Sequence, residues 1–518
     1  MASETLPDLL DASSRRFPDR PAVVDAAGNS LTYSQLKTQS DALSCFLAGR
    51  GVRAGDRVAV AVPKSLEAIV SFFGIMKAGA AYVPLDAWGP VERGRQILDE
   101  CNVRAAVVNH RTIAMTSGTA GLPLISIDDS SCAAGTVSFE DAVERAEPRA
   151  IARCTPNDVA YIIFTSGSTG VPKGAMITHA NAWSFLDWCS STFRPDETDR
   201  FANHAPFYFD ASVFDIYLSI KHGASVHLVS DELAKRPSDL AAFIASRRLT
   251  FWLSTPSALM MLARFGELEK HDCTSFKVVT FGGEVFPPRP LRDLKQRWPA
   301  SAFYNLYGPT EITTACTFAR IPDEIPAERT APFPIGFPAA HCGAMLLDDE
   351  GAPIADGEEG LLYISGPSVF AGYWNRPAET AKSILERDGI RWYNTGDVVR
   401  WHPTEGYTYV GRRDGQVKRR GFRIELGEIE QALYRHPSVA EAAVVAVSEP
   451  DGTVRIAAFL AWNGPPPSTV AIKTFCGTKL PAYMSPDVFV FLDRLPRTST
   501  DKVDLQALKS QVQHAGVG

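Results

Sequence analysis

Apolar positions along the chain alternate between the spacing of helices and that of buried strands. Leu36, Leu43 and Leu47 recur at helical intervals. The apolar run Val58–Val62 follows a Gly-Asp turn as a strand would, and Ser65–Lys77 again has helical spacing. Helices that alternate with short apolar runs predict a layered α/β fold whose sheets are largely buried.

The pattern changes at Gly411–Gly421, which is charged, bounded by glycines and poor in apolar side chains. Such a segment is typical of a linker or hinge. Beyond it we expect a helix around Glu428–Tyr434 and strands near Ala442–Val447 and Val454–Ala461. A further helix is expected after Pro467. This mixture predicts a small α+β domain.

The length of 518 residues agrees with more than one domain, since a single domain usually has about 100–200 residues. We place the boundary at Arg413–Asp414. The expected organisation is a large N-terminal α/β domain over residues 1–413 and a small, mobile C-terminal domain over residues 414–518.

Composition excludes several classes of protein. The net charge of -7 argues against a general nucleic-acid or membrane surface. Nine scattered cysteines without a C-x-x-C pair are typical of reduced thiols in the cytosol. The sequence from Met1 to Pro7 lacks the features of a signal peptide, and no apolar run approaches the roughly 20 residues of a membrane span. We therefore expect a cytoplasmic enzyme that binds neither nucleic acid nor membrane.

A candidate phosphate-binding loop, Thr165–Gly174, directly follows the β-rich run Tyr161–Phe164. Its glycines allow backbone N–H groups to converge on phosphate oxygens, its hydroxyls add donors, and Lys173 adds a positive charge. It is not the Walker loop, because no G-x-x-x-x-G-K-[ST] can be read through its glycines. A generic Gly/Ser tract is usually a surface turn, but this order of residues after a strand favours a polyphosphate site.

Further motifs follow along essentially the whole chain. They are LTYSQL from Leu31, KAGAAYVPLD from Lys77, YGPTE from Tyr307, GYW from Gly372, TGD from Thr395, the segment Gly411–Glu430 and LPAYM from Leu480. With the phosphate loop, their order resembles the ANL superfamily of adenylate-forming enzymes: acyl-CoA synthetases, luciferases and nonribosomal peptide synthetase adenylation domains. The resemblance implies the acyl-adenylate-forming fold and attack of a carboxylate oxygen on the α-phosphorus of MgATP, with release of pyrophosphate.

The resemblance also implies three catalytic residues. Glu311 is the expected Mg²⁺ ligand, since a hard carboxylate oxygen suits a hard cation that also binds phosphate. Thr310 is expected at the α-phosphate. Lys502 lies in the sequence TDKVD, where the family commonly has Asn-Gly-Lys, and is expected to bridge the substrate carboxylate and the phosphate in the transition state.

The resemblance also implies the residues that hold the nucleotide. Tyr307 would stack on adenine, with Asn305 and Tyr409 completing that pocket. Asp397 would accept the ribose hydroxyls, with donors from Arg412 nearby. The implied ATP-binding residues are Thr165, Ser166, Gly167, Ser168, Thr169, Gly170, Lys173, Asn305, Tyr307, Asp397, Tyr409 and Arg412.

Asp414 occupies the position of the family's domain-rotation hinge. The small domain would turn there to move Lys502 away and open a path for a thiol acceptor. Lys418 and Arg420 are expected to face solvent or a carrier's phosphate rather than the chemistry.

Asp210 points to the class of substrate, because amino-acid adenylation domains have an aspartate there that pairs with the substrate ammonium. Relatives that activate fatty or aryl acids usually lack it, since a half-buried carboxylate without a cation is costly. His204 is either an aromatic-gate equivalent or a core histidine. The implied substrate-binding residues are Asp210, Ala211, Phe214, Leu253, Val279, Phe281, Leu306, Thr314, Ala315 and His204.

Most of these pocket positions are apolar, which favours a hydrophobic substrate side chain. Phe281 and Leu306 are bulky, so the pocket is expected to be shallow or redirected. Either a small aliphatic α-amino acid or a β-amino acid would suit it, and the sequence does not decide between them.

The function we expect is ATP-dependent formation of an aminoacyl adenylate, then transfer to the phosphopantetheine thiol of a separate carrier protein. No segment after the small domain resembles a carrier protein with its Gly-Gly-x-Ser site. The alternative is an acyl- or aryl-CoA ligase of the same superfamily. A non-catalytic nucleotide-binding protein is opposed by Lys173, Glu311, Asp397 and Lys502.

Overall fold

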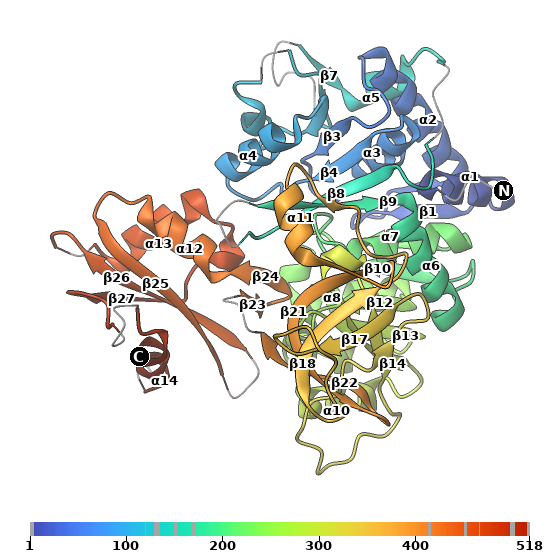
Figure 1. The fold of residues 1–518 in the computed structure, drawn as a ribbon. Helices are drawn as coiled ribbons and strands as arrows, with labels where there is room; N and C mark the ends of the chain where they lie inside the picture. The colour runs from blue at the N-terminus through green and yellow to red at the C-terminus, as the bar shows by residue number, and fades with distance from the viewer. Residues whose placement is uncertain are drawn as a thin grey trace.

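The computed structural model describes residues 5–119, 121–128, 135–149, 154–167, 172–412, 416–449, 453–465, 467–497 and 503–514. Figure 1 shows a large N-terminal body and, to one side of it, a smaller C-terminal part reached through the strands β23 and β24. The predicted combination of a large α/β domain and a small α+β domain is confirmed.

The phosphate loop belongs to an eight-stranded sheet of order β19-β9-β8-β4-β3-β5-β6-β7. It joins β8 to its antiparallel neighbour β9, while β3, β4 and β5 pair in parallel. The strands are β3 (Arg57–Val60), β4 (Ala81–Pro84), β5 (Ala105–Val108), β6 (Leu124–Ser126), β7 (Thr136–Ser138), β8 (Val159–Thr165), β9 (Lys173–Thr178) and β19 (Gly372–Tyr373). The strand predicted at Val58–Val62 is therefore confirmed, with slightly earlier bounds.

A nine-stranded sheet has the order β16-β15-β14-β13-β12-β10-β11-β1-β2 and is parallel from β14 to β1. Its strands are β1 (Pro21–Val24), β2 (Ser30–Thr32), β10 (Arg200–Asn203), β11 (Ser225–Leu228), β12 (Phe251–Ser254), β13 (Val278–Gly282), β14 (Ala302–Tyr307), β15 (Thr317–Arg320) and β16 (Phe337–Pro338). The carboxyl ends of its parallel strands meet at one edge, which is where open α/β sheets bind ligands.

The helices of the large body cover and separate these sheets (Figure 1). The predicted helices are confirmed as α2 and α3, which begin after the capping hydroxyls of Thr32 and Ser65. Residues 68–76 of α3 are all buried, as expected for a helix that is apolar on every side. The helices are α1 (Leu6–Arg16), α2 (Tyr33–Gly49), α3 (Leu66–Lys77), α4 (Val91–Cys101), α5 (Phe139–Glu144), α6 (His179–Phe193), α7 (Ala211–His222), α8 (Pro237–Arg247), α9 (Pro256–Phe265), α10 (Pro288–Arg297) and α11 (Pro377–Ser383).

A third, antiparallel sheet brings two predicted ATP-binding residues together. Asp397 on β21 lies opposite Arg412 on β22. The sheet has β18 between β17 and β21, with β20 and β22 also paired to β21. Its strands are β17 (Gly343–Leu347), β18 (Glu359–Ser365), β20 (Ile384–Arg387), β21 (Ile390–His402) and β22 (Gly406–Arg412).

The C-terminal part has the helices and strands that its sequence predicts. A hairpin of β23 (Gln416–Arg419) and β24 (Phe422–Glu425) is followed by a three-stranded sheet with its helices. These elements are α12 (Leu426–Tyr434), β25 (Val439–Ser448), β26 (Val454–Trp462), α13 (Thr469–Lys479), β27 (Val488–Leu492) and α14 (Leu505–His514).

The expectation of a linker over Gly411–Gly421 is wrong for most of that segment. Its first two residues end β22, and Gln416–Arg419 forms β23. The polar side chains are accommodated because they are paired: Gln416 Nε2 donates to Glu425 Oε1 at 2.5 Å, and Arg419 forms an ion pair with Asp487. The predicted domain boundary and the hinge residue Asp414 lie outside the described residues.

No helix in the described parts of the chain combines the length and the apolar character that crossing a bilayer requires.

Candidate active site

A cavity of about 540 Å³ lies between the ends of the parallel strands, the phosphate loop and the hairpin β23–β24. It gathers residues that are far apart in the sequence. The predicted site residues that line it are Thr165, Ser166, His204, Asp210, Ala211, Leu253, Leu306, Thr310, Thr314, Asp397 and Arg412.

One side of the cavity is built around the buried carboxylate of Asp397. Its Oδ1 accepts a hydrogen bond from Arg412 Nη1 at 2.7 Å, and its Oδ2 accepts one from the Tyr307 hydroxyl. Arg412 also donates to the carbonyl of Thr395 at 3.0 Å. Asp397 and Arg412 come from adjacent strands and Tyr307 from β14 of another sheet, so the carboxylate is held from two sheets where the ribose is expected.

Lys418 is nearer to this side than its sequence suggests. It lines the cavity, and its Nζ lies 4.9 Å from the centre of the Tyr307 ring. Burial lowers the pKa of Lys418, although the charge of Asp397 opposes that shift. The expectation that Lys418 faces solvent is therefore wrong, because β23 directs it into the site.

The three residues expected at adenine, Tyr307, Asn305 and Tyr409, do not line the cavity. The Asn305 side chain is buried and donates to the carbonyl of Pro334 at 2.9 Å. Tyr409 packs against the main hydrophobic core.

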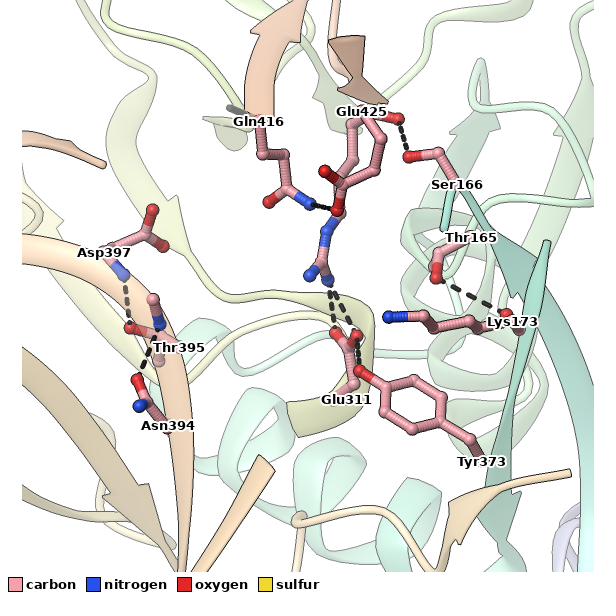
Figure 2. A network of polar contacts seen from close by, with 12 residues as sticks. Thr165, Ser166, Lys173, Glu311, Tyr373, Asn394, Thr395, Asp397, Gln416 and Glu425 are labelled. Atoms are coloured by element: carbon pink, nitrogen blue, oxygen red, sulfur yellow. Dashed lines mark hydrogen bonds and ion pairs between the residues drawn. The ribbon is translucent and has the colours of Figure 1, made fainter. Parts of the chain in front are cut away.

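Glu311, which is 0% exposed, lies behind the cavity wall next to Thr310, and its partner Arg423 lines the cavity. Arg423 Nη1 lies 2.7 Å from Oε1 and 2.8 Å from Oε2, and the Tyr373 hydroxyl donates to Oε1 at 2.5 Å. Burial raises the pKa of Glu311, but the Arg423 charge and the Tyr373 hydrogen bond outweigh burial and bring it below its ordinary value. Figure 2 shows Glu311 and Tyr373 together, with Lys173 beside them.

The described part of the phosphate loop reaches the same cluster. Ser166 Oγ donates to the carbonyl of Arg423 at 2.7 Å, and Lys173 Nζ lies 5.6 Å from the centre of the Tyr373 ring. The loop residues Ser168, Thr169 and Gly170 lie outside the described residues, as does Lys502.

Asp210 lies beside the cavity at the start of α7 and is linked to the phosphate side. Its carboxylate accepts a hydrogen bond from the Thr310 side chain, while Thr314 Oγ1 donates to its backbone carbonyl at 3.0 Å. Burial, with the nearby charge of Glu311, raises the pKa of Asp210 to about 6. Among the described residues no Lys, Arg or His forms an ion pair with Asp210.

The expected substrate pocket is only partly open. Ala211, Leu253, Leu306 and Thr314 line the cavity. The other four positions carried over from the family are buried behind this wall: Phe214, Val279, Phe281 and Ala315. The Phe214 ring packs against Phe193 and Phe201, and the Phe281 ring against Phe286, so aromatic packing closes the depth of the pocket.

His204, which the sequence assigns either to an aromatic gate or to the core, lies between the cavity and a core tryptophan. It lines the cavity, and its ring centre lies 5.2 Å from that of Trp252. Burial, with the Lys64 charge, lowers the pKa of His204 to about 3, so this ring is neutral near pH 7.

Comparison with known proteins explains why these residues converge. The sequence profile described as "AMP-binding enzyme" matches residues 10–374, and that described as "AMP-binding enzyme C-terminal domain" matches residues 428–502. The chain belongs to the AMP-binding enzyme family. It is an adenylate-forming ligase of the nonribosomal peptide synthetase adenylation type, which confirms the resemblance to the ANL superfamily.

Its relatives include two proteins named L-proline--[L-prolyl-carrier protein] ligase. The one from Pseudomonas fluorescens is 36% identical over 97% of this chain and 98% of its own. The one from Streptomyces coelicolor is 36% identical over 96% and 94%. Among solved structures, the Vibrio cholerae adenylation domain AlmE in complex with glycyl-adenosine-5'-phosphate has a TM-score of 0.82 and 25% identity, covering 98% of both chains.

Among the predicted site residues, Glu311 could supply one carboxylate to a magnesium ion. No group of three or more His, Cys, Asp or Glu side chains in the described residues could hold a metal. Glu311 would therefore act together with phosphate oxygens, as is usual for Mg²⁺. Because Arg423 and Tyr373 contact its oxygens here, Glu311 fits this role only when Arg423 has withdrawn.

Sequence reasoning identifies Glu311 but misses its partner Arg423, which lies 112 positions further on. The available signal is the alternation Phe422-Arg423-Ile424-Glu425, which predicts a strand with Arg423 on the opposite face from its apolar neighbours. Glu284, which accepts a hydrogen bond from the backbone of Gly421, has no comparable signal.

Proposed function

We propose that this enzyme activates a small aliphatic amino acid as its adenylate and transfers it to the phosphopantetheine thiol of a carrier protein. The observation that carries the proposal is Asp210, a carboxylate that lines the cavity without a cationic partner among the described residues. A substrate ammonium would supply that charge, because a buried carboxylate is stabilised by a paired cation. Thr310, which donates to Asp210, would lie between the ammonium site and the α-phosphate.

The walls of the cavity support a small side chain. Ala211, Leu306 and Thr314 leave shallow space, and the rings of Phe214 and Phe281 are packed behind them. The relatives that act on L-proline agree with this size. L-Proline is therefore the first substrate to test, and β-amino acids are the second class.

The proposed chemistry divides the site into two functions. The Thr165–Lys173 loop would hold the β- and γ-phosphates, and Asp397 with Arg412 would hold the ribose. Lys502 would bring its charge to the point where the carboxylate meets the α-phosphorus. A bound Mg²⁺ on Glu311 would neutralise charge on the phosphates.

Transfer to the carrier requires the C-terminal domain to move. We place the domain boundary at Arg413–Asp414 and propose Asp414 as the hinge. The hairpin β23–β24 already lines the cavity in the described arrangement, so this arrangement supports a state that follows adenylate formation. The carrier would be a separate protein.

Substrate-dependent ATP–pyrophosphate exchange tests the proposal. The panel contains L-proline, glycine, L-alanine, L-valine, β-alanine, 3-aminobutyrate, and propionate and benzoate as acids without an amino group. We expect the amino acids, and not the acids without an amino group, to support ATP–pyrophosphate exchange. We expect Asp210→Asn to lose this exchange. If the acids without an amino group alone give exchange and coenzyme A accepts the product, the enzyme is an acyl-CoA ligase and our proposal is wrong.

A further inference from the structure

Arg423 occupies two parts of the phosphate side at once. Its Nη1 lies 2.7 and 2.8 Å from the two carboxylate oxygens of Glu311. Its backbone carbonyl accepts a hydrogen bond from Ser166 Oγ at 2.7 Å. A single residue of the hairpin thus contacts both the carboxylate expected to hold the metal and a hydroxyl of the phosphate loop.

Independent contacts seat the hairpin β23–β24 in this position. Gly421 N donates to Glu284 Oε1 at 2.8 Å, and a Cβ at Gly421 would lie only 2.2 Å from Thr255 Cγ2. The ring centres of Phe209 and Phe422 are 4.8 Å apart. The position of Arg423 on Glu311 is therefore part of a packed interface and not the chance position of a surface side chain.

Two cations cannot share the Glu311 carboxylate. One nitrogen, Arg423 Nη1, faces both oxygens as a chelated metal ion would. Mg²⁺ binds oxygen at about 2.0–2.1 Å, so at the same face it would have no room beside the guanidinium and would be repelled by its charge. Glu311 is 0% exposed, and a buried carboxylate is strongly destabilised when it loses its only cation. Exchange of one cation for the other keeps it paired in both domain positions.

We propose that Arg423 is a positioning residue that replaces the magnesium ion on Glu311, so that docking of the hairpin and binding of the metal with the polyphosphate exclude each other. This inference rests on the proposed function, because it takes Glu311 as the metal ligand. When pyrophosphate leaves, the freed carboxylate and the freed Ser166 hydroxyl together recruit Arg423. The hairpin then docks in the arrangement that serves the carrier thiol.

Metal affinity tests the exclusion without measuring turnover. Mn²⁺ is titrated into the full-length enzyme with a non-hydrolysable ATP analogue, and free Mn²⁺ is followed by electron paramagnetic resonance. If the docked state holds about nine-tenths of the molecules, removing it tightens the apparent affinity about tenfold. Arg423→Gln is expected to bind Mn²⁺ with the analogue about tenfold more tightly than the wild type, and Arg423→Lys by less. The control Arg435→Gln removes an exposed arginine of the same domain and should match the wild type.

Hydrogen exchange reports the hairpin itself. Addition of Mn²⁺ and the analogue is expected to accelerate amide exchange of residues 416–425 in the wild type. In Arg423→Gln the exchange should be fast before any addition. Unchanged or weaker Mn²⁺ affinity in a folded Arg423→Gln or Arg423→Lys variant would overturn the exclusion.

Failure of the proposed function has a different signature. If Glu311→Gln leaves Mn²⁺ affinity unchanged, Glu311 is not the metal ligand, whatever Arg423 does. If Glu311→Gln weakens Mn²⁺ binding while Arg423→Gln does not strengthen it, only the exclusion is wrong.

Discussion

Two buried carboxylates, Asp397 at the wall of the cavity and Glu311 behind it, are held in different ways. Asp397 is paired with Arg412 on the neighbouring strand of the same sheet. Glu311 is paired with Arg423, which belongs to the hairpin beyond the proposed hinge. The proposed rotation of the C-terminal domain would leave the first pair intact and break the second. The proposed ribose side would then keep its ion pair, whereas the proposed phosphate side would change partners.

The largest effect is expected from a substitution on the phosphate side. Glu311→Gln removes the charge that serves the metal and Arg423 in turn. Loss of such electrostatic stabilisation should lower the rate of amino-acid-dependent ATP–pyrophosphate exchange about 10²–10³-fold. The variant should also undock the hairpin, since Arg423 loses its ion pair. Exchange assays and hydrogen exchange over residues 416–425 measure the two effects, and normal activity would remove Glu311 from the mechanism.

The same contrast separates the features that can be predicted from the sequence from those that cannot. Thr32 and Ser65 predict the starts of two helices because capping is local. The phosphate loop is recognisable because its residues are consecutive. The pairing of Arg423 with Glu311 depends on how one domain docks on another, and no local pattern contains that information.

The errors have the same physical origin. The charges and glycines of Gly411–Gly421 predict a linker. The strand forms instead because Arg419 finds its ion-pair partner in Asp487, which lies far along the chain and is not visible in the local pattern. Phe214 and Phe281, which the resemblance places in the pocket, are buried against neighbouring rings behind the cavity wall, and no local pattern predicts that packing. Composition reports what a side chain prefers on average, and tertiary partners decide what it does.

A substitution on the ribose side should instead lower the free energy of unfolding. Asp397→Asn removes the ion pair between this carboxylate and the Arg412 side chain, which is only 6% exposed. Removing one partner of a buried pair costs about 3–5 kcal/mol, and we expect about 3 kcal/mol because asparagine keeps one hydrogen-bond acceptor. Urea unfolding of the large domain measures this loss. Amide hydrogen exchange of the hairpin should rise less than in Glu311→Gln, because Asp397 acts on the hairpin only through the charge of Lys418, and a larger rise would contradict the division into two sides.

Asp210, the carboxylate proposed to bind the substrate ammonium, should give a pH signature. Asp210 must be ionised to pair with an ammonium, and its pKa in the free enzyme is raised to about 6. Amino-acid affinity should therefore fall as the pH drops through 6. Asp210→Asn should lose this dependence and weaken binding about 30-fold, since a charged hydrogen bond is worth about 1.5–3 kcal/mol. His204, with a pKa of about 3, does not titrate in this window. Calorimetric titration between pH 5 and 8 checks both, and a pH-independent wild type would contradict the role of Asp210.

The smallest effect should come from an ion pair that joins the domains outside the cavity. Arg93 on α4 pairs with Glu428 on α12, with the two side chains 13% and 4% exposed. In the described residues Glu428 Oε2 has no hydrogen-bond partner, so Arg93 is its main stabilising contact. Arg93→Gln should shift the domains away from the docked arrangement and slow transfer to the carrier about tenfold, which corresponds to about 1.4 kcal/mol.

Pyrophosphate exchange should be unchanged in Arg93→Gln, because the pair belongs only to the docked arrangement. Arg93→Glu combined with Glu428→Arg should restore much of the transfer rate, since it rebuilds the pair with its charges exchanged. Single-turnover transfer from preformed adenylate to a phosphopantetheinylated carrier separates the two half-reactions. Equal losses in both would show that Arg93 supports folding of the large domain rather than the docking of its partner, and the switch would then rest on Arg423 and Glu311 alone.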